Sequence, residues 1–137
     1  LVILATNQPG IARGYLDWET LNEMHRRLRE VVTLDAVEVC PHTDADGCAC
    51  RKPKGGMRLA AAGRFSIELA ASYFVGDTER DVRAAEAAGA TPVLIDAPYN
   101  RQLSVPCRAP NLAAAADWIL SGGSRGPCAP ASSGTSV

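Results

Sequence analysis

Three cysteines and a histidine lie within the short stretch CPHTDADGCAC. They are Cys40, His42, Cys48 and Cys50, so five residues separate a Cys-x-His pair from a Cys-x-Cys pair. Four thiolate and imidazole ligands are typical of a tetrahedral structural zinc site, and free thiols beside a surface histidine seldom cluster so closely. Because the protein would fill all four positions, no position would remain for a substrate, and we predict a structural zinc ion.

A basic stretch, RKPK, follows the last of these cysteines directly. A zinc ion bound at Cys50 would fix the direction of Arg51 and Lys52. A guanidinium group offers paired N–H donors to phosphate oxygens, and an ammonium group offers a compact charge. The stretch is therefore either part of a phosphate site or a solvated basic turn, and these residues alone do not decide between the two.

Two further polar segments follow apolar runs that have the composition of buried strands. Thr6, Asn7 and Gln8 come after LVILA, and their side chains and backbone N–H groups could bind an anion or simply form a turn. Asp77 comes after YFVG, where a carboxylate could hold Mg²⁺. The following Thr78-x-x-Asp81 pattern resembles a helix capping box. Both interpretations of the second segment can hold at once.

Short apolar runs alternate with stretches of helical periodicity along the chain. We predict strands over 1–5, 34–39, 73–77 and 91–96, and helices over 17–31, 56–64, 78–88 and 111–120. This alternation favours an α/β fold, with a parallel sheet and helices on both faces. Ligands of such folds bind beyond the carboxyl ends of the strands, which is where the three polar segments described above are expected to converge.

Composition places limits on the fold and on the partners. The 137 residues fit one domain, which we assign to 1–120, and residues 121–137 read as a disordered tail because 11 of those 17 are Gly, Ser or Pro. A net charge of −1 offers no bulk attraction to nucleic acid or to an anionic membrane. With no membrane-spanning apolar run and an odd number of cysteines, we expect a soluble cytoplasmic protein rather than a secreted disulfide-linked one.

Three stretches together resemble one enzyme family. VILATNQPGIARG, CPHTDADGCACRKPKGGM and YFVGDTERDVRAAEAAG, which lie within about residues 1 to 96, are similar to segments of the haloacid dehalogenase (HAD) superfamily of phosphatases. The resemblance is greatest to the D-glycero-D-manno-heptose 1,7-bisphosphate phosphatase branch, which is close to the histidinol-phosphate phosphatases. It implies a HAD-like Rossmannoid sheet with a zinc-stapled loop and no large cap domain. It also implies that the protein is a hydrolase of carbohydrate metabolism.

The resemblance also implies roles for particular residues. Thr6 and Lys52 would stabilise the transferring phosphoryl group. The substrate would be bound by Thr6, Asn7, Gln8, Pro9, Arg51 and Lys52. Asp77 would bind the catalytic Mg²⁺, and Cys40, His42, Cys48 and Cys50 would bind the structural Zn²⁺. Thr78 stands where the family often has lysine, and Pro9 where it often has a small polar residue, which leaves the substrate preference open.

The family's nucleophile and general acid are two aspartates of an Asp-x-Asp motif on a strand that precedes the first stretch. No such strand precedes it here, so we interpret the chain as an N-terminally truncated fragment that should not turn over by itself. The implied function is phosphomonoester hydrolysis on a small sugar bisphosphate, through an aspartyl-phosphate, by a protein that is monomeric at full length. The alternatives are a histidinol-phosphate phosphatase, and a non-catalytic zinc-stabilised module that binds a phosphorylated ligand or a protein.

Overall fold

The computed structural model describes residues 1–123, and the predicted tail lies outside this part except for Ser121–Gly123. The described residues form five strands, four α-helices and two short 3₁₀ helices. In chain order they are β1 (Ile3–Asn7), α1 (Trp18–Val31), β2 (Ala36–Cys40), α2 (Gly56–Phe65), η1 (Leu69–Ala71), β3 (Tyr73–Gly76), α3 (Glu79–Ala87), β4 (Thr91–Ile95), η2 (Pro98–Asn100), β5 (Arg108–Ala109) and α4 (Leu112–Leu120). No described helix has the length and apolarity needed to cross a membrane.

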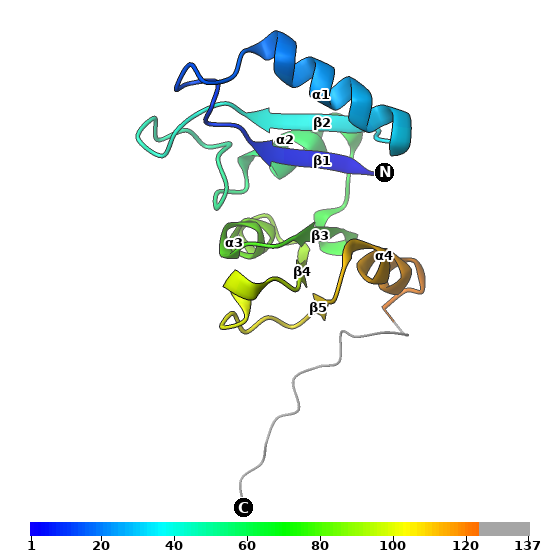
Figure 1. Cartoon of the computed structure of the whole chain (residues 1–137). Helices are drawn as coiled ribbons and strands as arrows, with labels where there is room; N and C mark the ends of the chain where they lie inside the picture. The colour runs from blue at the N-terminus through cyan, green and yellow to red at the C-terminus, as the bar shows by residue number, and fades with distance from the viewer. Residues whose placement is uncertain (124–137) are drawn as a thin grey trace, which may run out of the picture. The chain divides into compact units, whose positions relative to one another are not determined.

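The chain divides into two compact units, Leu1–Ile67 and the part that starts at Glu68. In the first unit, β1 and β2 pair in parallel with Asn7 opposite Cys40, and α1 runs along this pair in Figure 1. Helix α1 begins where the Asp17 carboxylate accepts a hydrogen bond of 2.7 Å from the Thr20 N–H. It buries Leu21 completely. The register of the strand pair places the residue after β1 next to the start of the cysteine loop.

In the second unit, β3, β4 and β5 form a parallel sheet in that order. Helix α3 lies on one side of this sheet and α4 on the other (Figure 1). Val93, Cys107, Ala109, Ala115 and Trp118 form a buried core between the sheet and α4. The Trp118 ring meets Tyr73 edge to face, with 5.4 Å between ring centroids.

The predicted α/β architecture with parallel strands is confirmed, with shifts of one or two residues at most element ends. The first strand begins at Ile3 rather than at residue 1 and continues through Asn7, since its last pairs reach Cys40. The strands form two sheets, one in each unit, where the sequence predicted one. Strand β5 and helix η2 were not predicted because two- and three-residue elements carry no periodicity.

Candidate functional site

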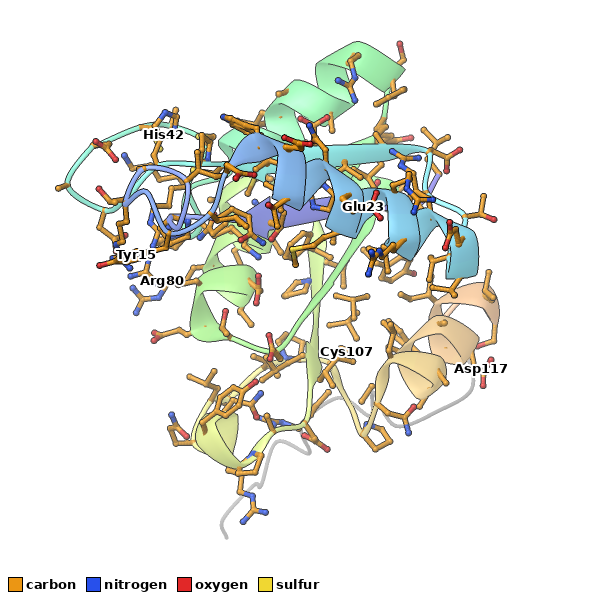
Figure 2. The ribbon with its side chains drawn as sticks, turned by 45° about the horizontal axis from the view of Figure 1, so that its top comes forward. Tyr15, Glu23, His42, Arg80, Cys107 and Asp117 are labelled. Carbon is orange, nitrogen blue, oxygen red and sulfur yellow. The ribbon has the colours of Figure 1, made fainter. Side chains whose placement is uncertain are left out.

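The four predicted zinc ligands come together in the first unit. Figure 2 shows His42 on the long loop that follows β2. The Cys40 sulfur lies 3.7 Å from the Cys48 sulfur and 3.1 Å from the Cys50 sulfur, and His42 Nδ1 lies 3.3 Å from Cys50. All four donor atoms lie within 4.8 Å of one another. The edges of a tetrahedron around zinc with Zn–S bonds of about 2.3 Å measure about 3.8 Å, so the donor set fits this ion.

The thiols of this cluster influence each other's ionisation. Desolvation opposes the Cys48 thiolate, but hydrogen bonds from the Arg51 N–H and from neighbouring thiols outweigh it and lower the Cys48 pKa to about 7. Burial, followed by the hydrogen bonds and charges of Cys40 and Cys48, raises the Cys50 pKa to about 12. The Cys48 thiolate therefore forms readily, and its negative charge opposes ionisation of the Cys50 thiol by repulsion. A divalent cation, which requires deprotonated thiols, would relieve that repulsion.

The loop is closed by a close backbone approach at Gly56, the first residue of α2. Its N–H donates to the Ala49 carbonyl oxygen at 3.2 Å. A Cβ atom at position 56 would lie 2.7 Å from the Ala49 carbonyl carbon, so only glycine fits there. This contact joins the end of the cysteine loop to the helix that follows the basic stretch.

The end of β1 and the basic stretch meet through Asn7 and Lys52. The Lys52 N–H donates to Asn7 Oδ1 at 3.1 Å, and Asn7 Nδ2 donates back to the Lys52 carbonyl at 3.3 Å. The Lys52 ammonium donates to the Ala5 carbonyl at 3.3 Å. The Gln8 amide donates to Thr6 Oγ1 at 3.0 Å. The structure thus brings Lys52 to the end of β1, although it lies 45 residues after Asn7 in the sequence.

Two predicted substrate-binding residues have other contacts. Arg51 donates to the Asp44 carboxylate through Nε and Nη2, at 2.9 and 3.3 Å, and to the His42 carbonyl through Nη1 at 3.1 Å. Pro9 offers its carbonyl to the Arg13 N–H at 3.1 Å within the turn after β1. The sequence alone gave Asp44 no partner. A guanidinium has five N–H donors, so these contacts leave two for other acceptors.

Asp77 lies in the second unit, directly after β3. Its backbone carbonyl accepts from Asn100 Nδ2 at 2.7 Å, and its carboxylate accepts from the Tyr99 hydroxyl. That hydrogen bond to Asp77 raises the Tyr99 pKa, and burial adds to the effect. The carboxylate is exposed enough to reach a cation, and its oxygens are of the type that Mg²⁺ prefers.

The predicted capping box after Asp77 is confirmed. Asp81 Oδ2 accepts from the Thr78 hydroxyl at 2.6 Å and from the Thr78 N–H at 3.1 Å, and the Asp81 N–H donates to Thr78 Oγ1 at 3.3 Å. Asp81 is buried against Gly76, where an added Cβ would lie 2.5 Å from the Asp81 side chain. Only glycine at position 76 therefore allows β3 and the start of α3 to approach this closely.

Tyr99 and Asn100 were missed by sequence reasoning, although they follow the carboxyl end of a predicted strand. Asn100 is 1% exposed. Its Nδ2 also donates to the Ile95 carbonyl at 2.8 Å, and its Oδ1 accepts from the Ala97 N–H and from Arg108, each at 3.1 Å. The amide is thereby fully satisfied and connects the turn at Asp77 with β5.

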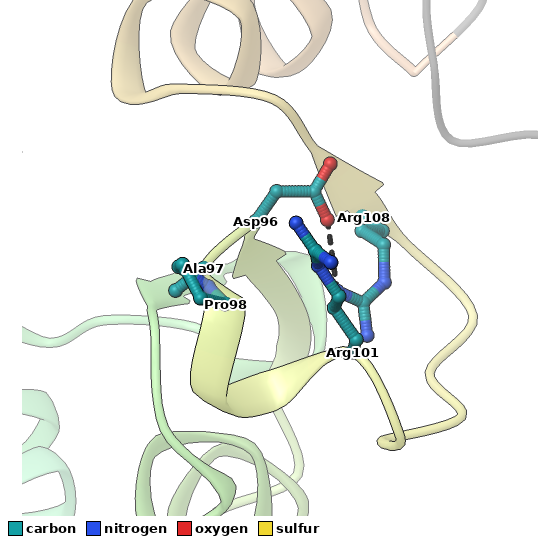
Figure 3. Close-up of a pocket in the computed structure, with 5 residues that line it drawn as sticks. All are labelled: Asp96, Ala97, Pro98, Arg101 and Arg108. Atoms are coloured by element: carbon teal, nitrogen blue, oxygen red, sulfur yellow. Dashed lines mark hydrogen bonds and ion pairs between the residues drawn. The ribbon is translucent and has the colours of Figure 1, made fainter.

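A cavity of about 400 Å³ lies beyond the carboxyl end of β4. Figure 3 shows its lining, in which the Arg108 guanidinium pairs with Asp96 at 2.8 Å beside Arg101. Arg108 also donates to the Asn100 and Leu103 carbonyls. None of the predicted site residues lines this cavity. The hydrogen bonds of Arg108 stabilise the loop between β4 and β5.

Comparison with known proteins supplies the family. A family model described as HAD-hydrolase-like matches residues 49–103. The chain is 40% identical in sequence to D,D-heptose 1,7-bisphosphate phosphatase from Bordetella bronchiseptica, whose crystal structure was determined in complex with magnesium and phosphate. The match covers 88% of this chain and 74% of that one, with a TM-score of 0.82. The chain belongs to the HAD-like hydrolases. The resemblance stated from sequence is therefore confirmed.

Other HAD-like relatives carry the same kind of name. D-glycero-β-D-manno-heptose-1,7-bisphosphate 7-phosphatase of Pseudomonas putida is 50% identical over 99 residues, which cover 69% of this chain and 57% of that protein. A relative from Campylobacter jejuni, named for the α anomer, is 39% identical over 89 residues, covering 61% of this chain and 51% of its own length. The chain thus spans little more than half the length of these curated relatives.

Proposed function

We propose that this chain forms the zinc-loop and phosphate-binding parts of a D-glycero-D-manno-heptose 1,7-bisphosphate 7-phosphatase. The reaction would be hydrolysis of a phosphomonoester through an aspartyl-phosphate. The observation that carries the proposal is the reciprocal pair between Asn7 and the Lys52 backbone. It holds a basic side chain beside the polar end of β1, and relatives that are 50% and 40% identical to the chain overall are named for that activity.

In this proposal, Lys52 supplies positive charge to the phosphoryl oxygens, and Thr6 and Asn7 supply hydrogen-bond donors. Such donors act by stabilising charge that develops on the transferring group. Gln8, Pro9 and the free donors of Arg51 would complete the substrate contacts. Asp44 and Asp46 form an Asp-x-Asp pattern, but they lie on the cysteine loop, where Asp46 accepts from Thr43 at 2.6 Å. We therefore assign neither as nucleophile.

The two metal ions have separate places in the proposal. Asp77 would hold Mg²⁺, which supplies charge neutralisation to phosphoryl transfer when it is bound. Cys40, His42, Cys48 and Cys50 would hold Zn²⁺, with no ligand position left for substrate. The Tyr99 hydroxyl would fix one Asp77 oxygen and leave the other available to the cation.

We test the substrate assignment by calorimetric titration of the chain with D-glycero-D-manno-heptose 1,7-bisphosphate and, separately, with histidinol phosphate. Binding of the heptose bisphosphate alone is expected, and Lys52→Met should weaken it about tenfold or more, as for loss of a charge-assisted hydrogen bond. The matched control is Arg27→Gln, a charge removed from the exposed face of α1. Preference for histidinol phosphate would overturn the heptose assignment, and binding of neither would overturn the phosphatase assignment.

We also propose that the protein acts as a monomer in the cytoplasm on a small phosphorylated sugar. The near-neutral net charge of −1 supports the absence of a nucleic-acid partner. Light scattering coupled to gel filtration tests the oligomeric state, and a dimer mass at micromolar concentration would contradict this part.

A further inference from the structure

The basic stretch that follows the last cysteine folds back onto the cysteine loop. Arg51 Nη1 donates to the carbonyl of His42, itself a predicted ligand, at 3.1 Å. The Lys54 ammonium donates to the carbonyls of Gly47 and Cys48, at 2.9 and 2.7 Å. Each of these two basic side chains thus donates to the backbone carbonyl of a predicted ligand residue.

Asp44 holds the Arg51 guanidinium in this position. Two Arg51 nitrogens face the two carboxylate oxygens of Asp44, at 2.9 and 3.3 Å. The Arg51 side chain is only 12% exposed, whereas that of Asp44 is 60% exposed. A paired planar contact of this kind fixes the orientation of the guanidinium group as well as the position of its charge.

These contacts would stabilise a filled zinc site for two reasons. Three thiolates leave one net negative charge on a Zn²⁺ centre, which nearby cations offset. Hydrogen bonds to the backbone on either side of the ligands also limit the movement by which a ligand leaves the metal. Lys52 makes a different set of contacts, since its ammonium and backbone reach Ala5 and Asn7 at the end of β1.

We propose that Arg51, Asp44 and Lys54 form a clasp that retains zinc, whereas the Lys52 ammonium is directed to β1 instead. The three clasp residues are positioning residues, because they act on the ligands and not on the metal. The inference rests on the zinc binding proposed above. It assigns a role to Asp44 and Lys54, which the motif by itself does not.

The test is the rate at which zinc leaves the full chain in excess chelator, followed with a zinc-sensitive dye. Arg51→Gln and Lys54→Met should each release zinc about tenfold faster or more, as is usual when partners of metal ligands are removed. Asp44→Asn should have a smaller effect, since Arg51 can still reach the His42 carbonyl. Arg27→Gln removes a charge from α1 and should not change the rate. Far-UV circular dichroism before chelation confirms that each variant is folded.

A double variant separates a clasp from a general effect of charge. If Asp44 acts only through Arg51, then Asp44→Asn combined with Arg51→Gln should release zinc no faster than Arg51→Gln alone. Additive effects of the two changes, or release rates equal to that of the unmodified chain, would overturn the clasp. Absence of zinc from the unmodified chain would instead overturn the zinc proposal itself, and the clasp with it.

Discussion

Replacing Asn100 with alanine tests whether one buried amide organises the second unit. Its side chain takes part in four hydrogen bonds, to the carbonyls of Asp77 and Ile95 and from the Ala97 N–H and Arg108. With Asn100 only 1% exposed, its removal takes a buried partner from the Asp77 and Ile95 carbonyls and from the Ala97 N–H, whereas Arg108 keeps its pairing with Asp96. At about 1 kcal/mol for each bond the loss is about 4 kcal/mol, and water entering the space would reduce it toward about 2 kcal/mol.

The measurement is urea denaturation followed by the fluorescence of Trp118, which is buried in the second unit. Trp18→Phe as a common background removes the other tryptophan, which lies at the start of α1. The transition midpoint should fall with little change in the slope against urea. A matched control is Asn111→Ala, which removes the one N-cap hydrogen bond that Asn111 Oδ1 accepts from the Ala114 N–H and should cost about 1 kcal/mol.

A second substitution keeps the size of the side chain and changes only the donor. In Asn100→Asp, an oxygen replaces Nδ2 and faces the carbonyls of Asp77 and Ile95, so this variant should be at least as unstable as the alanine variant. If both changes at Asn100 cost no more than the Asn111→Ala control, the reasoning from buried hydrogen bonds is refuted. The loop at Asp77 would then be held by its own backbone.

Three further outcomes are expected. Gly76→Ala should destabilise the second unit by about 1–3 kcal/mol in the same urea assay, because its Cβ would meet Asp81 at 2.5 Å; an unchanged midpoint would contradict this contact. In the metal-free chain, iodoacetamide should modify Cys48 before Cys50. The rate of modification of Cys48 should rise as the pH passes about 7, because the thiolate is the reactive form. If mass spectrometry shows Cys50 modified first, the assigned order of ionisation is wrong. Removing zinc with a chelator should lower the melting temperature of the first unit and leave unchanged the unfolding transition of the second unit, which Trp118 reports. Loss of zinc without a change in the first unit's melting temperature would mean that zinc does not support the fold.

The sequence by itself determined the local features of this protein. The N-terminal starts of α1 and α3 could be predicted from Asp17 and from the Thr78–Asp81 pair, because a capping interaction joins residues three positions apart. The zinc ligand set likewise could be predicted, since all four ligands lie on one short loop and their chemistry is specific. The alternation of strands and helices gave the parallel α/β class for the same local reason.

Only the tertiary structure decided which residues meet across long separations in sequence. Asn7 pairs with Lys52 at a separation of 45 residues, and Asn100 holds Asp77 at a separation of 23, and no periodicity or spacing encodes either contact. The tertiary structure also divided the basic stretch, directing Arg51 to Asp44 and Lys52 to the end of β1. These contacts depend on how the strand register and the loop closure place backbone groups in space, and a linear pattern of residue types does not contain that information.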